Sequence, residues 1–66
     1  MMETKKTLDK FIECGIIDDW KYRRIVQSYY FKKDGKTVEI GEGNVLYWIN
    51  NDCLTWGLAL HFTKEK

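Results

Sequence analysis

Few side chains in this sequence have the type and spacing that catalysis or metal binding requires. The reactive groups are Cys14, Cys53 and the single histidine, His61. If residues 53–62 form an extended strand, Cys53 and His61 share a face but lie roughly 26 Å apart. That separation is too long for a thiol and its base, and no two of these groups have the short ligand spacing of a zinc site. The sequence therefore predicts neither a cysteine nucleophile nor a metal site.

The remaining polar motifs also have simple structural explanations. Asp18 and Asp19 would point to opposite faces of a strand, or one of them would cap a helix. The run from Gly41 to Asn44 is glycine-containing but shorter than a phosphate-binding loop, and we expect no helix after it. We therefore predict that the protein is not an enzyme and has no cofactor.

The residues that best suit binding lie between positions 20 and 36, where aromatic and basic side chains alternate. Aromatic rings and arginine are enriched at protein-interface hot spots, and rings among basic groups also suit single-stranded nucleic acid. The common alternative is that the rings fill a core while the lysines are solvated along a strand edge. The predicted binding residues are Trp20, Tyr22, Arg23, Arg24, Tyr29, Phe31, Lys32 and Lys33.

The charge of this segment stands out against the rest of the chain. Residues 21–36 contain six basic residues and one acidic residue, whereas the formal net charge of the whole chain is +1. The remaining residues contain five lysines and nine acidic residues, so they carry a net charge of −4. A net charge near zero argues against a strongly positive field over the whole surface. Any nucleic-acid contact is therefore expected in residues 20–36.

Length and composition restrict the class of protein. The chain has 66 residues, of which 44% are hydrophobic, 32% charged and 15% aromatic. This apolar and aromatic content is too high for an intrinsically disordered chain, and no apolar run reaches the roughly 18 residues of a membrane span. The first residues are polar rather than the apolar core of a secretory signal. We expect one small globular domain over residues 1–66, located in the cytoplasm and without membrane contact.

Hydrophobic periodicity predicts one helix followed by strands. Leu8, Phe11 and Ile12 form a stripe on a helix over about residues 7–14, and Gly15 suits a left-handed C-cap. The segment 20–33 fits either a helix or a strand, and the turn at 33–36 favours a strand with Tyr30 opposite Val38. Three further strands are predicted at residues 37–40, 45–50 and 53–62, the last from strict alternation of large and small residues.

The predicted fold is α+β, with a short N-terminal helix packed on a four-stranded antiparallel meander. The alternative is two helices followed by a β-hairpin, which has a winged-helix-like outline.

Function is predicted from the surplus of aromatic residues and the lack of catalytic groups. In size and character the chain resembles small phage or mobile-element proteins that inhibit or redirect a host factor, although no motif carries this likeness to a named family. The prediction is a small non-catalytic module that binds a host protein as a regulator or inhibitor. The alternative is a nucleic-acid-binding protein that uses residues 20–36, and a homodimer is compatible with both.

Overall fold

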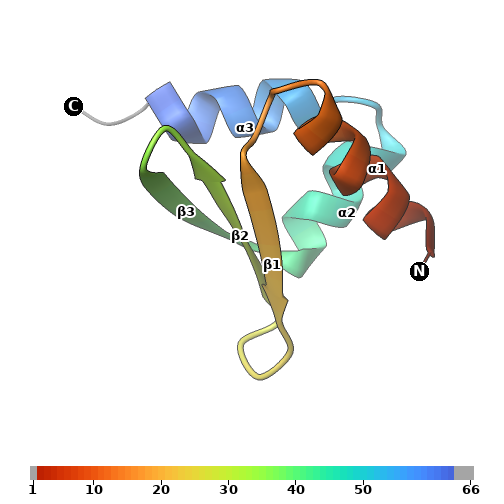
Figure 1. Cartoon of the computed structure of the whole chain (residues 1–66). Helices are drawn as coiled ribbons and strands as arrows, with labels where there is room; N and C mark the ends of the chain where they lie inside the picture. Colours follow the sequence, from red (N-terminus) through yellow and green to blue (C-terminus); the bar gives the residue numbers. More distant parts are fainter. Residues whose placement is uncertain (1, 64–66) are drawn as a thin grey trace.

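The computed structural model describes residues 2–63, which form an α+β fold with three helices and one three-stranded antiparallel sheet (Figure 1). This confirms the predicted class, but the four-stranded meander is wrong, and so is the winged-helix-like alternative, because a single helix precedes the sheet. The elements in order are α1 (Met2–Glu13), β1 (Asp19–Arg23), β2 (Ser28–Lys33), β3 (Lys36–Gly41), α2 (Glu42–Asn50) and α3 (Leu54–Thr63).

The turn between β2 and β3 forms at the predicted place. Asp34 (φ 52°) and Gly35 (φ 82°) both have left-handed backbones, which is the type I′ geometry of a two-residue hairpin loop. Because this loop has no bulge, Tyr30 lies opposite Glu39. The predicted pairing of Tyr30 with Val38 is therefore wrong by one residue.

The segment predicted as one strand from Trp20 to Lys33 is instead a hairpin of β1 and β2. Residues 24–27 form the turn between them, closed by a hydrogen bond from Gln27 N–H to the Arg24 carbonyl (3.2 Å). The Gln27 carbonyl in turn accepts from Glu42 N–H at the start of α2 (2.9 Å). This four-residue turn contains no Gly, Pro or Asn, so the usual turn signals are missing.

The two predicted C-terminal strands are wrong, since residues 45–50 lie in α2 and 54–62 in α3. The helical contact between them explains the small residue at position 57. A Cβ built at Gly57 would lie 2.5 Å from ring carbons of Trp48, so glycine is what lets α3 approach α2 this closely. A helix also follows Gly41 directly, contrary to the prediction that none does.

The N-terminal helix α1 begins at Met2, earlier than the predicted residue 7, and ends as predicted. Gly15 has φ 81°, and Ile16 N–H donates to the Phe11 carbonyl (3.0 Å), which is a Schellman C-cap. Leu8 on this helix is fully buried. The helix contacts α2 and, through Asp9, Trp20 of β1, whereas the prediction packed it on a four-stranded meander.

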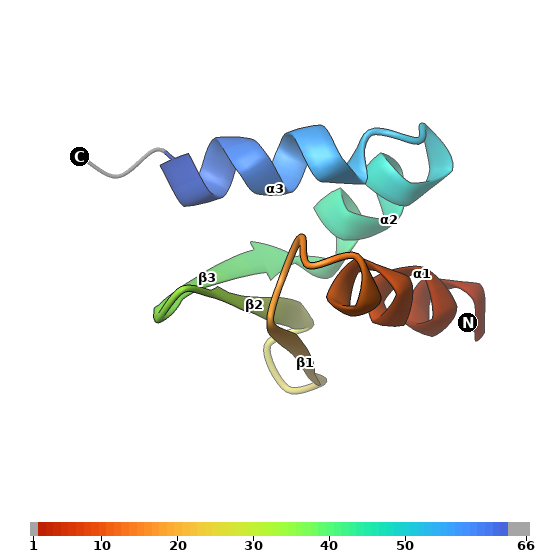
Figure 2. The same cartoon turned by 45° about the horizontal axis from the view of Figure 1, so that its top comes forward.

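The helices lie on one side of the sheet, and α3 forms the outermost layer (Figure 2). Helix α2 packs against β2 and β3 and against both other helices. None of the helices within residues 2–63 combines the length and the apolar character that crossing a bilayer requires. The buried apolar side chains of the core are Leu8, Ile17, Tyr29, Phe31, Ile40, Val45, Trp48, Leu54 and Leu58.

Candidate functional surfaces

The predicted binding residues do not form one surface, because the β1–β2 hairpin divides them between the two faces of the sheet. All four predicted aromatic residues lie on the inner face, toward the helices. Phe31 is fully buried and Tyr29 is 8% exposed, so neither ring is presented to a partner. The rings pack on each other, with centroids 4.8 Å apart for Tyr22 and Tyr29 and 6.0 Å apart for Trp20 and Tyr29.

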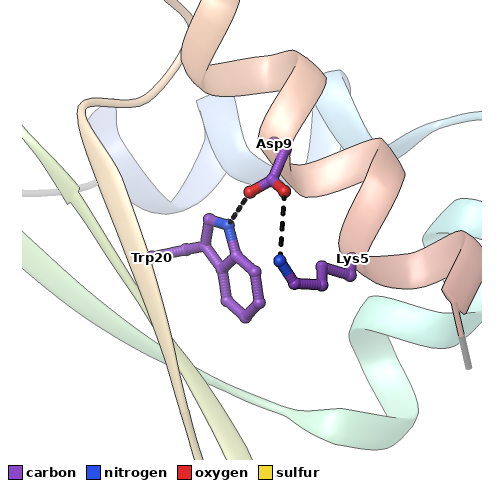
Figure 3. A network of polar contacts seen from close by, with 3 residues as sticks. All are labelled: Lys5, Asp9 and Trp20. Carbon is purple, nitrogen blue, oxygen red and sulfur yellow. Dashed lines mark hydrogen bonds and ion pairs between the residues drawn. The ribbon is translucent and has the colours of Figure 1, made fainter.

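Trp20 and Tyr22, which are half-buried, also connect β1 to the helices through polar atoms. The indole N–H of Trp20 donates to Asp9 Oδ1 on α1 (3.0 Å), and Lys5 pairs with the other oxygen of Asp9 (3.5 Å; Figure 3). The Tyr22 hydroxyl donates to Glu42 Oε1 on α2 (3.1 Å). Burial raises the pKa of Tyr22, and this hydrogen bond raises it further. Burial likewise raises the pKa of Tyr29. These contacts indicate a structural role for the predicted aromatic set.

The predicted basic residues are separated as well. Binding through basic residues requires that their side chains are exposed. Exposed side chains are found at Arg23, at Arg24 in the β1–β2 turn, and at Lys32. Lys33 is half-buried and donates from Nζ to the Gly15 carbonyl (2.7 Å), so it joins β2 to the end of α1. Three of the four basic residues therefore remain available to a ligand.

The first candidate surface is the face of the sheet turned away from the helices, here called the outer sheet face. Strand alternation places nine residues on it. Tyr30 lies at its centre, between Lys21 on β1 and Glu39 on β3. A shallow hollow of about 250 Å³ lies over this face, with Lys21, Arg23, Tyr30 and Lys32 in its lining. The nine residues are Asp19, Lys21, Arg23, Ser28, Tyr30, Lys32, Thr37, Glu39 and Gly41.

The second candidate surface is the outward side of α3, here called the α3 stripe. Its members are exposed and recur at the three- and four-residue spacing of one helix face. Trp56 is 60% exposed and Leu60 is 48% exposed. None of the residues is charged. They are Thr55, Trp56, Ala59, Leu60 and Thr63.

The α3 stripe was missed because a strand over residues 53–62 would place its alternating large residues, which include Leu54, Trp56, Leu58 and Leu60, on a single face that packs in the core. The helix separates them, burying Leu54 and Leu58 while exposing Trp56 and Leu60. The helical spacing of Val45, Trp48 and Ile49 in α2 was the signal that could have revealed a helical C-terminal half.

The reactive groups occupy different parts of the fold: Cys14 follows α1, Cys53 precedes α3, and His61 lies in α3 rather than in the strand that was predicted. No group of three or more His, Cys, Asp or Glu side chains in the described residues is arranged to hold a metal ion. Cys14 and Cys53 are free thiols, the first exposed and the second half-buried. The His61 ring packs edge-on against the Trp48 ring, with centroids 5.7 Å apart. This places His61 in a packing contact between α3 and α2.

Comparison of the chain with protein-family models, with curated proteins and with solved structures finds no match. The two surfaces are therefore the features from which a function can be argued.

Proposed function

We propose that this protein is a non-catalytic module that binds an apolar surface of a partner protein through the α3 stripe. The observation that carries the proposal is the exposure of Trp56 and Leu60, one helical turn apart on a helix that is apolar on both its sides. A helix that is apolar all round is normally buried. In the described chain, the side of α3 that faces away from the core has no such cover.

The chemistry of the α3 stripe defines the kind of partner. Because the stripe has no charge, it gains nothing from an acidic or basic surface and is matched by an apolar one. Tryptophan is among the residue types that most often dominate interface energies. Ala59 is next to Leu60, one helical turn from Trp56, and is small enough for the partner's backbone to approach α3 closely. A module of this kind acts by occupying a surface of its partner, as a regulator or an inhibitor does.

The test is capture of a partner by the tagged protein, compared between Trp56→Lys and Ile25→Lys. Ile25 is 90% exposed in the β1–β2 turn, away from α3, so Ile25→Lys adds the same charge at another exposed apolar position. We expect the unchanged protein and Ile25→Lys to capture one partner, and Trp56→Lys to lose it. Thermal unfolding of the three proteins should agree, because both replaced side chains are exposed.

One result would overturn the proposal, and another would identify the partner as a second copy of this chain. Capture retained by Trp56→Lys would overturn the assignment to α3. Sedimentation of the purified protein addresses a second copy as the partner: self-association that Trp56→Lys abolishes and Ile25→Lys preserves would make the protein a homodimer through this same helix.

A further inference from the structure

The basic residues of the segment 20–36 have no role in binding through α3, and most of them gather around the outer sheet face. Four basic side chains lie on this face or in the turns that bound it, against three acidic ones. The four basic residues form no ion pair with any described residue. The basic residues are Lys21, Arg23, Arg24 and Lys32, and the acidic ones are Asp19, Asp34 and Glu39.

The centre of this face is aromatic. Tyr30 is half-buried and is the one aromatic residue among the nine of the outer sheet face. Two of its closest basic neighbours come from different strands: Lys21 lies directly opposite it on β1, and Lys32 lies two residues along β2. Same-face residues on a strand are about 6.6 Å apart, so Lys21 and Arg23 form a short row of positive charge beside the ring.

We propose that the outer sheet face binds single-stranded nucleic acid, with a base stacked on Tyr30 and phosphates contacted by Lys21, Arg23 and Lys32. Single-stranded sites join a basic groove that follows the backbone to aromatic rings on which bases stack. The four residues named here line the shallow hollow over this face together with Asp19, Trp20 and Thr37. Stacking requires an unpaired base, which a duplex does not offer without disruption. The proposal is independent of binding through α3.

The experiment measures fluorescence anisotropy of a labelled single strand, made as RNA and as DNA, and of the matching DNA duplex. We expect both single strands to bind more tightly than the duplex. Affinity should fall with salt, with a slope of log affinity against log salt of about −2, since each phosphate contact with a single strand contributes about −0.7.

Four substitutions localise the contact. Arg23→Gln should flatten the salt slope by about 0.7, whereas Lys10→Gln, at an exposed lysine on α1, should leave it unchanged. Tyr30→Leu keeps an apolar side chain but removes the ring, and should weaken binding about tenfold. Tyr30→Phe keeps the ring and should bind like the unchanged protein.

Tyr47→Leu is the matched control for loss of a ring, because Tyr47 is 63% exposed on α2, outside the sheet. It should bind normally. The proposal is overturned by absence of binding at low salt, by tighter binding of the duplex, or by equal effects of Arg23→Gln and Lys10→Gln. Equal effects of Tyr30→Leu and Tyr47→Leu would overturn it as well.

Discussion

The outer sheet face and the α3 stripe belong to the same small molecule but differ in how they can attract a ligand. Five of the nine residues on the outer sheet face are charged, whereas the stripe has none. The difference extends along the chain, since residues 43–63 contain one aspartate and no lysine or arginine. Attraction at the sheet depends on salt, while attraction at α3 depends on apolar area. One hydrophobic core thus supports two surfaces that attract ligands by different forces. Substitutions in the core test whether one surface can be disrupted without the other.

The largest effect is expected from Phe31→Ala, which removes a fully buried ring from β2 at the centre of the core. Loss of such a side chain costs about 3–5 kcal/mol of the free energy of unfolding, so both surfaces should be disrupted together. Urea unfolding followed by circular dichroism measures the change. Tyr30→Leu, at the neighbouring position on the opposite face, is the control and should cost much less. A small effect of Phe31→Ala would contradict the assignment of this ring to the core.

The next largest loss of stability is expected from Gly57→Ala, which should disturb the packing of α3 on α2 and leave the sheet unchanged. The added methyl group would overlap the Trp48 ring, and overpacking of this kind costs about 1–3 kcal/mol. The matched control is Gly43→Ala in α2, where the added Cβ meets nothing within 4 Å. That variant should be more stable by about 0.5–1 kcal/mol, because alanine favours a helix over glycine. Thermal unfolding of both variants checks the opposite signs.

The sequence predicted the parts of the fold that depend on local chemistry. Gly15 and the Asp34–Gly35 pair adopt left-handed backbones at the predicted C-cap and turn, and Asp52 (φ 58°) does so between the two strands predicted at 45–50 and 53–62. These residues tolerate a conformation that most others avoid. The turn that contains Asp52 joins two helices rather than the two predicted strands. The residues that favour a turn do not determine which elements it connects.

The C-terminal half was predicted wrongly because α3 is apolar on both sides. Its large residues alternate along the sequence as in a strand, and at the same time Leu54 and Leu58 are spaced as on a helix. The alternating small residue Gly57 is explained by Trp48, which is distant enough in sequence that no local pattern reveals the contact.

The sequence was sufficient to predict which charged side chains are exposed on the candidate surfaces, but not which aromatic rings are. Arg23 and Lys32 are exposed because burying an unpaired charge is costly, whatever the fold. Which rings become buried depends on the pairing of β1 with β2, which puts Trp20 opposite Phe31 and Tyr22 opposite Tyr29. That pairing leaves Tyr30 on the outer face, although it was not among the predicted residues.

A smaller effect is expected from Trp20→Phe, which removes the hydrogen bond to Asp9 that ties the sheet to α1. A hydrogen bond of this kind contributes about 1 kcal/mol, so the free energy of unfolding should fall by about that amount. Trp56→Phe on the α3 stripe makes the same chemical change at an exposed position and should leave stability unchanged. Equal losses in the two variants would show that the contact with Asp9 does not stabilise the fold. Chemical denaturation resolves the difference.

The smallest effect concerns alkaline pH. Folding raises the pKa of Tyr22 and Tyr29 above the ordinary value of 10.0, so the unfolded chain releases these protons first. Stability is therefore complete below pH 10 and decreases as the pH rises from there through the folded-state pKa values. Denaturation at a series of alkaline pH values measures the decrease, and Tyr22→Phe should reduce its steepness. A rise in stability over this range would contradict the direction of the shifts.

The order β1-β2-β3 has a consequence for how fast the molecule forms. Each strand pairs with its immediate neighbour along the chain, and α2 follows β3 without a break. Domains that combine helices with a sheet of neighbouring strands fold more slowly than helical bundles but faster than all-β domains, in times of the order of milliseconds. The sequence also contains no proline, so refolding lacks the slow isomerisation step that takes tens of seconds in other chains. A stopped-flow trace should accordingly show one fast phase, in which both surfaces appear together.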